Sequence, residues 1–118
     1  MTAPTNILIV EDEPLIAMML EDFLEILDKV PVGTADCVSA ALDLVQAGGI
    51  DAAILDLNLR GGETSLPVAD ALAAANIPFV FATGGSHDSV TERFRDRPSL
   101  AKPFTMDSVA KALESLGD

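Results

Sequence analysis

The sequence has little of three things that would point to particular classes of protein: cysteine, basic residues and long apolar runs. Its 118 residues include one cysteine, Cys37, so no disulfide forms within the chain and we expect a reducing, cytoplasmic environment. Lysine and arginine number 7 against 19 acidic residues, and the net charge of -12 would repel a phosphate backbone, so nucleic-acid binding is not expected. No apolar stretch approaches the roughly 18 residues of a membrane-spanning helix, so no membrane partner is expected either.

Tryptophan and tyrosine are absent, and His87 is the one histidine. A switch that turns an aromatic ring would therefore have to use one of the 5 phenylalanines. Apolar residues, in contrast, make up 49% of the chain, which is enough for a sizeable core in a domain of this length. We expect a single domain over residues 1–118 without an effector domain, because one repeating pattern uses almost every residue.

That pattern is an alternation of short apolar runs with helical patterns, typical of a doubly wound α/β fold with a parallel sheet and helices on both faces. It predicts strands at 6–10, 31–35, 52–55, 78–82 and 99–101, and helices at 14–28, 36–46, 64–75, 86–95 and 106–116. Asp36 and Thr105 are the expected N-caps of two of these helices. In the first helix the expected core stripe is Leu15, Ile16, Met19, Leu20, Phe23, Leu24 and Leu27, with Met18 outside it.

Acidic and hydroxyl side chains stand at the ends of the predicted strands. Glu11 and Asp12 follow the first strand, Asp56 follows the third, and Thr83 follows the fourth. Because the carboxyl ends of parallel strands share one edge of a sheet, we expect these side chains to meet there. Clustered carboxylates repel one another, so the site should contain a cation or a basic partner. Lys102, directly after the last short strand, can be that partner.

With these residues the chain resembles the receiver domains of response regulators, the CheY-like phosphoacceptor half of two-component signalling. The resemblance covers the whole length and rests on four stretches in order, 10–13, 55–59, 82–84 and 102–104. It implies a flavodoxin-like, five-stranded parallel sheet of order 2-1-3-4-5 with five helices. It also implies a stand-alone, single-domain response regulator of a phosphorelay, which is a signalling switch and not an enzyme apart from its Mg²⁺-dependent self-phosphorylation and self-dephosphorylation.

The resemblance implies a metal site and a phosphoryl site that share one residue: Glu11, Asp12, Asp56 and the backbone carbonyl of Asn58 for Mg²⁺ or Mn²⁺, and Asp56, Lys102 and Thr83 for the phosphoryl group. Asp56 is the phosphoacceptor in this scheme, and Glu11 holds a metal-bound water. The chemistry requires such residues, because transfer to a carboxylate brings two anions together and depends on positioning and charge neutralisation.

The resemblance also implies partners. Receivers accept phosphoryl groups from a histidine kinase or a histidine phosphotransfer protein, which docks on the first helix, here near Met18 and Leu15. A downstream protein, whose identity the sequence does not indicate, would then recognise the modified state.

Residues 81–85 resemble the start of the FAT GUY motif of one receiver subgroup, but His87 stands in the part that differs from it. Ser99 occupies the usual place of the aromatic switch residue. We therefore expect the segment 84–95 to be ordered by the phosphoryl group without a ring flip, and a solvated position suits His87 better than a sensing role.

Two other functions and one other origin of the chain are possible at this stage. A metal-dependent phosphohydrolase of the haloacid-dehalogenase type would need a second acid where this chain has Asn58. A pseudo-receiver that only binds partners would be expected to lose Asp56, Lys102 or the acid pair. A fragment of a longer regulator or hybrid kinase would show the same residues and stays an open alternative.

Overall fold

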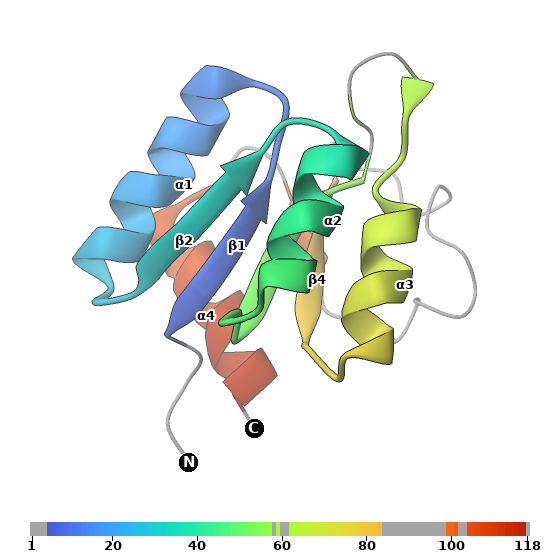
Figure 1. Cartoon of the computed structure of the whole chain (residues 1–118). Helices are drawn as coiled ribbons and strands as arrows, with labels where there is room; N and C mark the ends of the chain where they lie inside the picture. Colours follow the sequence, from blue (N-terminus) through green and yellow to red (C-terminus); the bar gives the residue numbers. More distant parts are fainter. Residues whose placement is uncertain (1–4, 58, 60–61, 84–98, 102–103, 118) are drawn as a thin grey trace.

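The computed structural model describes residues 5–57, 59, 62–83, 99–101 and 104–117 (Figure 1). In chain order the elements are β1 (Asn6–Val10), α1 (Pro14–Ile26), β2 (Val30–Ala35), α2 (Val38–Ala47), β3 (Ala52–Asp56), α3 (Leu66–Ala74), β4 (Phe79–Thr83), β5 (Ser99–Ala101) and α4 (Met106–Gly117). Each described element lies within two residues of its predicted start and end, and the predicted helix at 86–95 lies outside the described residues.

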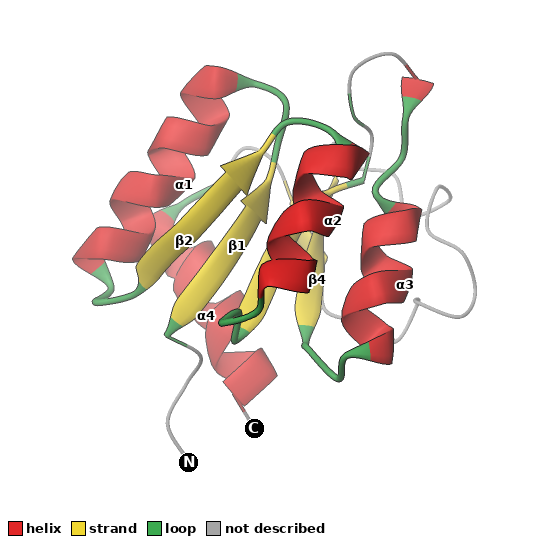
Figure 2. Ribbon diagram, in the orientation of Figure 1, coloured by secondary structure: helices red, strands yellow, loops and turns green. Residues whose placement is uncertain are grey.

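The strands form one parallel sheet in the order β2-β1-β3-β4-β5, which is the order that the resemblance to receiver domains implies. Figure 2 shows the helices on both sides of this sheet, with α1 and α4 on one face and α2 and α3 on the other. The carboxyl ends of the strands therefore lie at one edge between two helical layers.

Burial on both faces explains why the central strands are uninterrupted apolar runs. Side chains alternate between the two cores: Leu8, Val10, Ala53 and Leu55 face α2 and α3, and Ile7, Ile9, Ala52 and Ile54 face α1 and α4. The rings of Phe79 and Phe81 pack edge to face in the first core, with centroids 5.4 Å apart.

The predicted core stripe of α1 is wrong at Leu15, which is 79% exposed. The buried residues of this helix are Ala17, Leu20 and Leu24. At 3.6 residues per turn, Leu15 lies roughly 140° around the helix from Leu20, and Met18 roughly 160°. Both side chains therefore point away from the sheet, and Met18 is 57% exposed.

The two predicted N-caps have opposite outcomes. Asp36 is not the cap of α2, because Cys37 occupies that position and its side chain makes no capping hydrogen bond. Thr105, directly before α4, is confirmed: its Oγ1 accepts from the Ser108 N–H at 3.0 Å, and its own N–H donates to Ser108 Oγ at 3.0 Å. This reciprocal pair satisfies amides that the first turn of a helix leaves without partners.

Replacing the cap is expected to destabilise the protein. Thr105→Ala should lower the free energy of unfolding by about 1 kcal/mol, because the Ser108 amide loses its acceptor. Cys37→Ala is the matched control, since Cys37 holds the same position on α2 without a capping bond. Urea unfolding of both variants measures the difference, and equal losses would contradict the assigned role of Thr105.

Candidate functional site

Three of the predicted site residues meet at the carboxyl edge of the sheet. One carboxylate oxygen from each of Glu11, Asp12 and Asp56 lies within 4.8 Å of the others. Glu11 is 2% exposed and Asp56 is 7% exposed, whereas Asp12 is half-buried. Most of the negative charge of the cluster is therefore shielded from water. Repulsion between carboxylates is stronger in such a buried place than in water.

Strand pairing brings these acids together. In the register of β1 and β3, Val10 lies opposite Leu55, so the residues that follow, Glu11 and Asp56, lie side by side at the carboxyl edge of the sheet. The Glu11 N–H donates to the carbonyl of Ala35 at 2.9 Å, which continues the contact between β1 and β2 by one residue. Glu11 Oε2 also accepts from the N–H of Glu13 at 3.0 Å, so Glu11 is held both through its backbone and through its carboxylate.

The connection between β3 and α3 is held by apolar anchors and backbone hydrogen bonds. Leu57 and Leu59 are buried in the core beneath α2 and α3. The Ser65 N–H donates to the Leu57 carbonyl at 2.9 Å, and the Leu59 N–H donates to the Glu63 carbonyl at 2.8 Å. The connection that follows Asp56 is thus closed by a backbone hydrogen bond between its first and last parts, at Leu57 and Ser65.

The other predicted site residues are placed only in part. Thr83 is the last residue of β4, where the neighbouring Ala82 lies opposite Asp56. Lys102 directly follows β5, but Lys102, Asn58 and His87 lie outside the described residues. Of the residues 81–85 that resemble the FAT GUY motif, 84 and 85 also lie outside them, and membership of that subgroup stays a prediction.

One interacting residue near the site was missed in the sequence. Glu63 Oε1 accepts from the N–H of Val38, the first residue of α2, at 3.1 Å. The two residues are 25 positions apart, so no local pattern could indicate the contact.

The donor set suits a hard divalent cation. All three residues offer carboxylate oxygens, which Mg²⁺ and Mn²⁺ prefer, and a cation of this size also keeps several water ligands. A bound cation would neutralise part of the charge that the fold concentrates here.

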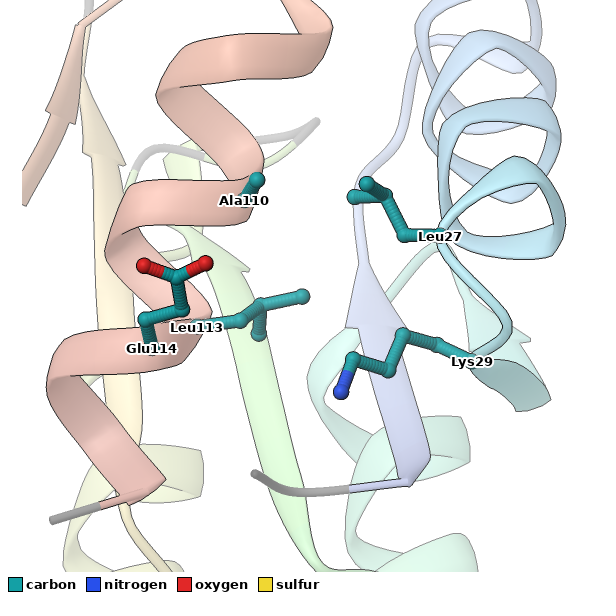
Figure 3. A pocket seen from close by; sticks show the side chains of 5 residues that line it. All are labelled: Leu27, Lys29, Ala110, Leu113 and Glu114. Carbon is teal, nitrogen blue, oxygen red and sulfur yellow. The ribbon is translucent and has the colours of Figure 1, made fainter. Parts of the chain in front are cut away.

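A pocket of about 140 Å³ lies elsewhere, between the end of α1 and α4 (Figure 3). It is lined by Leu27, Lys29, Ala110, Leu113 and Glu114. Lys29 directly precedes β2, whose first residue pairs with the first residue of β1, so this pocket is at the amino ends of the strands. It is therefore separate from the acid cluster.

Residues 7–114 match the family model of the response regulator receiver domain, and the chain belongs to this family. It is accordingly a signalling switch of two-component systems and not a classical enzyme, and membership implies a kinase as the source of the phosphoryl group.

Solved structures of similar proteins include SdrG from Sphingomonas melonis Fr1, at 77% identity over 98% of each chain with a TM-score of 0.88. The BeF3-activated conformation of SdrG from Pseudomonas melonis Fr1 is 75% identical over 100% of each chain, with a TM-score of 0.86. A curated relative is the phyllosphere-induced regulator PhyR of Methylorubrum extorquens, 35% identical over 112 residues. That match covers 92% of this chain, which spans only 42% of PhyR.

Within the described residues, no helix has the length and apolar character needed to cross a membrane.

Removing one acid of the cluster should separate metal binding from stability. Asp12→Ala is expected to raise the metal-free free energy of unfolding by on the order of 1 kcal/mol, because it removes one of three mutually repelling charges. In the wild type, Mg²⁺ at a hundred times its Kd should add about 2.7 kcal/mol, and Asp12→Ala should lose that gain.

Thermal melts and calorimetric titration with and without Mg²⁺ measure both effects. Asp43→Ala is the control, since it removes an exposed acid from α2 outside the cluster. An Asp12→Ala protein that kept wild-type Mg²⁺ affinity would show that the cation binds somewhere else.

Proposed function

We propose that the chain is a single-domain response regulator over residues 1–118 that accepts a phosphoryl group from phosphohistidine on Asp56. The observation that carries the proposal is the burial of Asp56 at the end of β3, within reach of two further carboxylates. Support for the single-domain form is the match to SdrG over 98% of each chain. The alternative of a fragment from a longer regulator stays open, given the greater length of PhyR.

In this proposal Asp12, Asp56 and the backbone carbonyl of Asn58 hold Mg²⁺ or Mn²⁺, and Glu11 holds a water bound to it. The cation supplies charge neutralisation, which allows an anionic carboxylate and an anionic phosphoryl group to approach. A carboxylate oxygen of Asp56 attacks phosphorus while the bond from phosphorus to the imidazole nitrogen of the donor breaks. The backbone hydrogen bonds of Leu57 support this role, because they would hold the chain beside Asp56 during the attack.

Lys102 and Thr83 complete the proposed phosphoryl site. The ammonium of Lys102 would pair with a phosphoryl oxygen, and the hydroxyl of Thr83 would donate to another. Their positions in the chain support these roles, since Ala101 lies opposite Thr83 in the pairing of β4 with β5.

We also propose that the segment 86–95 forms the fifth helix of a flavodoxin-like fold. β4 and β5 are parallel neighbours, and such strands need a crossover connection, which is usually an α-helix. With Ser99 in the place of the usual switch aromatic, this crossover is the part that we propose to respond to phosphorylation.

The partner surface that we propose is the outward face of α1. Leu15 and Met18 are exposed there, in the first turns of the helix that follows Glu11 and Asp12. Exposed apolar side chains, and a flexible methionine in particular, suit adaptable protein contacts. A histidine kinase or histidine phosphotransfer protein docked on this face would have its phosphohistidine close to Asp56. We propose that a downstream protein in the cytoplasm recognises the phosphorylated state. Direct contact with nucleic acid is not part of the proposal, because the net charge is -12.

Phosphorylation should depend on Asp56 and on Mg²⁺. The wild type is expected to take up label from a small phosphodonor or a phosphohistidine kinase, and Asp56→Asn should lose it, because an amide is not a nucleophile of comparable strength. Phosphoprotein gels run with Mg²⁺ and with a chelator measure the label. Equal label on both proteins would place the acceptor elsewhere, and no label on either would refute the proposed function.

The docking face can be tested apart from the chemistry. The double change Leu15→Ser and Met18→Ser should slow phosphotransfer from a cognate kinase about tenfold, because two anchoring side chains are lost. Labelling by a small phosphodonor should stay unchanged, since that reaction needs no docking. Ile26→Ser is the matched control, being 63% exposed in the last turn of α1. Equal slowing by the control, or slowing with both donors, would contradict the assignment of this face.

A further inference from the structure

The start of α2 depends on a side chain from elsewhere in the sequence. Cys37 has an extended backbone at the N-cap position and makes no capping hydrogen bond through its side chain. The next amide, that of Val38, donates instead to Glu63 Oε1 at 3.1 Å. An anionic acceptor is well suited to this place, because the first amides of a helix carry partial positive charge and lack partners within the helix.

Glu63 belongs to the connection that directly follows Asp56. Its backbone carbonyl accepts from the Leu59 N–H at 2.8 Å, and two positions later the Ser65 N–H donates to the Leu57 carbonyl at 2.9 Å. Glu63 thus makes a hydrogen bond within this connection through its backbone carbonyl and a second one to α2 through its carboxylate.

These bonds form part of a circuit around the acid cluster. The Glu11 N–H donates to the carbonyl of Ala35. Val38 follows Ala35 by three residues. From Val38 the carboxylate of Glu63 leads to the connection after Asp56, and the pairing of β3 with β1 closes the circuit. Among the links described here, the contact of Glu63 with Val38 is the one that a side chain provides.

We propose that Glu63 is a positioning residue for the cation site. By tying the connection after Asp56 to the start of α2, its carboxylate holds the acids at the spacing that a divalent cation requires. Glu63 does not touch the cluster itself and acts through the backbone on either side of it. The inference rests on the proposed function, because it assumes that the acid cluster binds a cation.

Two substitutions separate the hydrogen bond from the charge. Glu63→Gln keeps an acceptor oxygen at the same reach and removes the charge, whereas Glu63→Asp keeps the charge and shortens the side chain by one methylene. Glu63→Ala removes both. Positioning through the bond predicts that Glu63→Gln stays within twofold of wild-type Mg²⁺ affinity. Glu63→Asp and Glu63→Ala should bind Mg²⁺ about tenfold more weakly, which is the lower end of the loss seen when residues that orient metal ligands are removed. Glu114→Ala and Glu114→Gln are the controls, since Glu114 is an exposed acid at the opposite edge of the sheet.

The first measurement is hydrogen exchange at the Val38 amide in the metal-free protein. Protection should fall in Glu63→Asp and Glu63→Ala and persist in Glu63→Gln and in both Glu114 variants. The second is a Mg²⁺ titration followed by NMR, together with the rate of labelling by a small phosphodonor at low and at saturating Mg²⁺. Weaker affinity with a maximal rate near that of the wild type is the expected signature of positioning.

Several results would overturn the inference. Unchanged exchange at Val38 in Glu63→Ala would show that the bond is absent in solution. Lost protection with Mg²⁺ affinity within twofold of wild type would show that the bond supports α2 alone. Equal weakening by Glu63→Gln and Glu63→Ala would assign the effect to charge. A wild type that binds Mg²⁺ and is labelled, with Glu63 variants that match it, refutes the inference and leaves the proposed function intact, whereas a wild type that does neither refutes both.

Discussion

The pairing of β1 with β3 is the constraint on which the rest of the structure depends. With Val10 opposite Leu55, Glu11 and Asp56 must lie next to each other at the edge of the sheet, and most of both side chains is removed from water. Such a cluster opposes folding, since each added carboxylate raises the electrostatic free energy of the others. The two apolar cores on the faces of the sheet stabilise the fold against that opposition. The protein can therefore hold an arrangement of charge that a bound cation would relieve.

Features set by local patterns could be predicted from the sequence, and features set by distant contacts could not. The central strands are apolar along their whole length because both faces are covered, so their positions could be predicted closely. Thr105 could be recognised because its partner Ser108 is three residues away, within the same turn. The prediction that Leu15 belongs to the core is wrong. The helical spacing of apolar residues admits it, but whether the side chain is buried depends on where the sheet lies. The contact of Glu63 with Val38 joins two segments that only the fold brings together.

The helix starts at 38 and 106 illustrate how capping can be coupled to a site or kept apart from it. α4 is capped within its own first turn, by Thr105 and Ser108, so its cap uses no residue from another part of the chain. α2 is capped by Glu63, a residue of the connection after Asp56, so the start of α2 and that connection are bonded as one unit. A change at Asp56 therefore has a bonded route to the layer formed by α2 and α3, in addition to any route through the segment after Thr83.

The overall charge of the chain also shapes how a phosphoryl group can reach Asp56. A net charge of -12 attracts cations to the acid cluster but repels an anionic donor. At physiological ionic strength this repulsion is screened beyond about 8 Å, so it acts mainly on a partner that is already close to the surface. Exposed apolar side chains such as Leu15 and Met18 can offset this short-range repulsion, because burying them in an interface supplies attraction at contact. An acidic receiver is thus suited to a donor that first docks through apolar contacts on α1 and then transfers its phosphoryl group at short range.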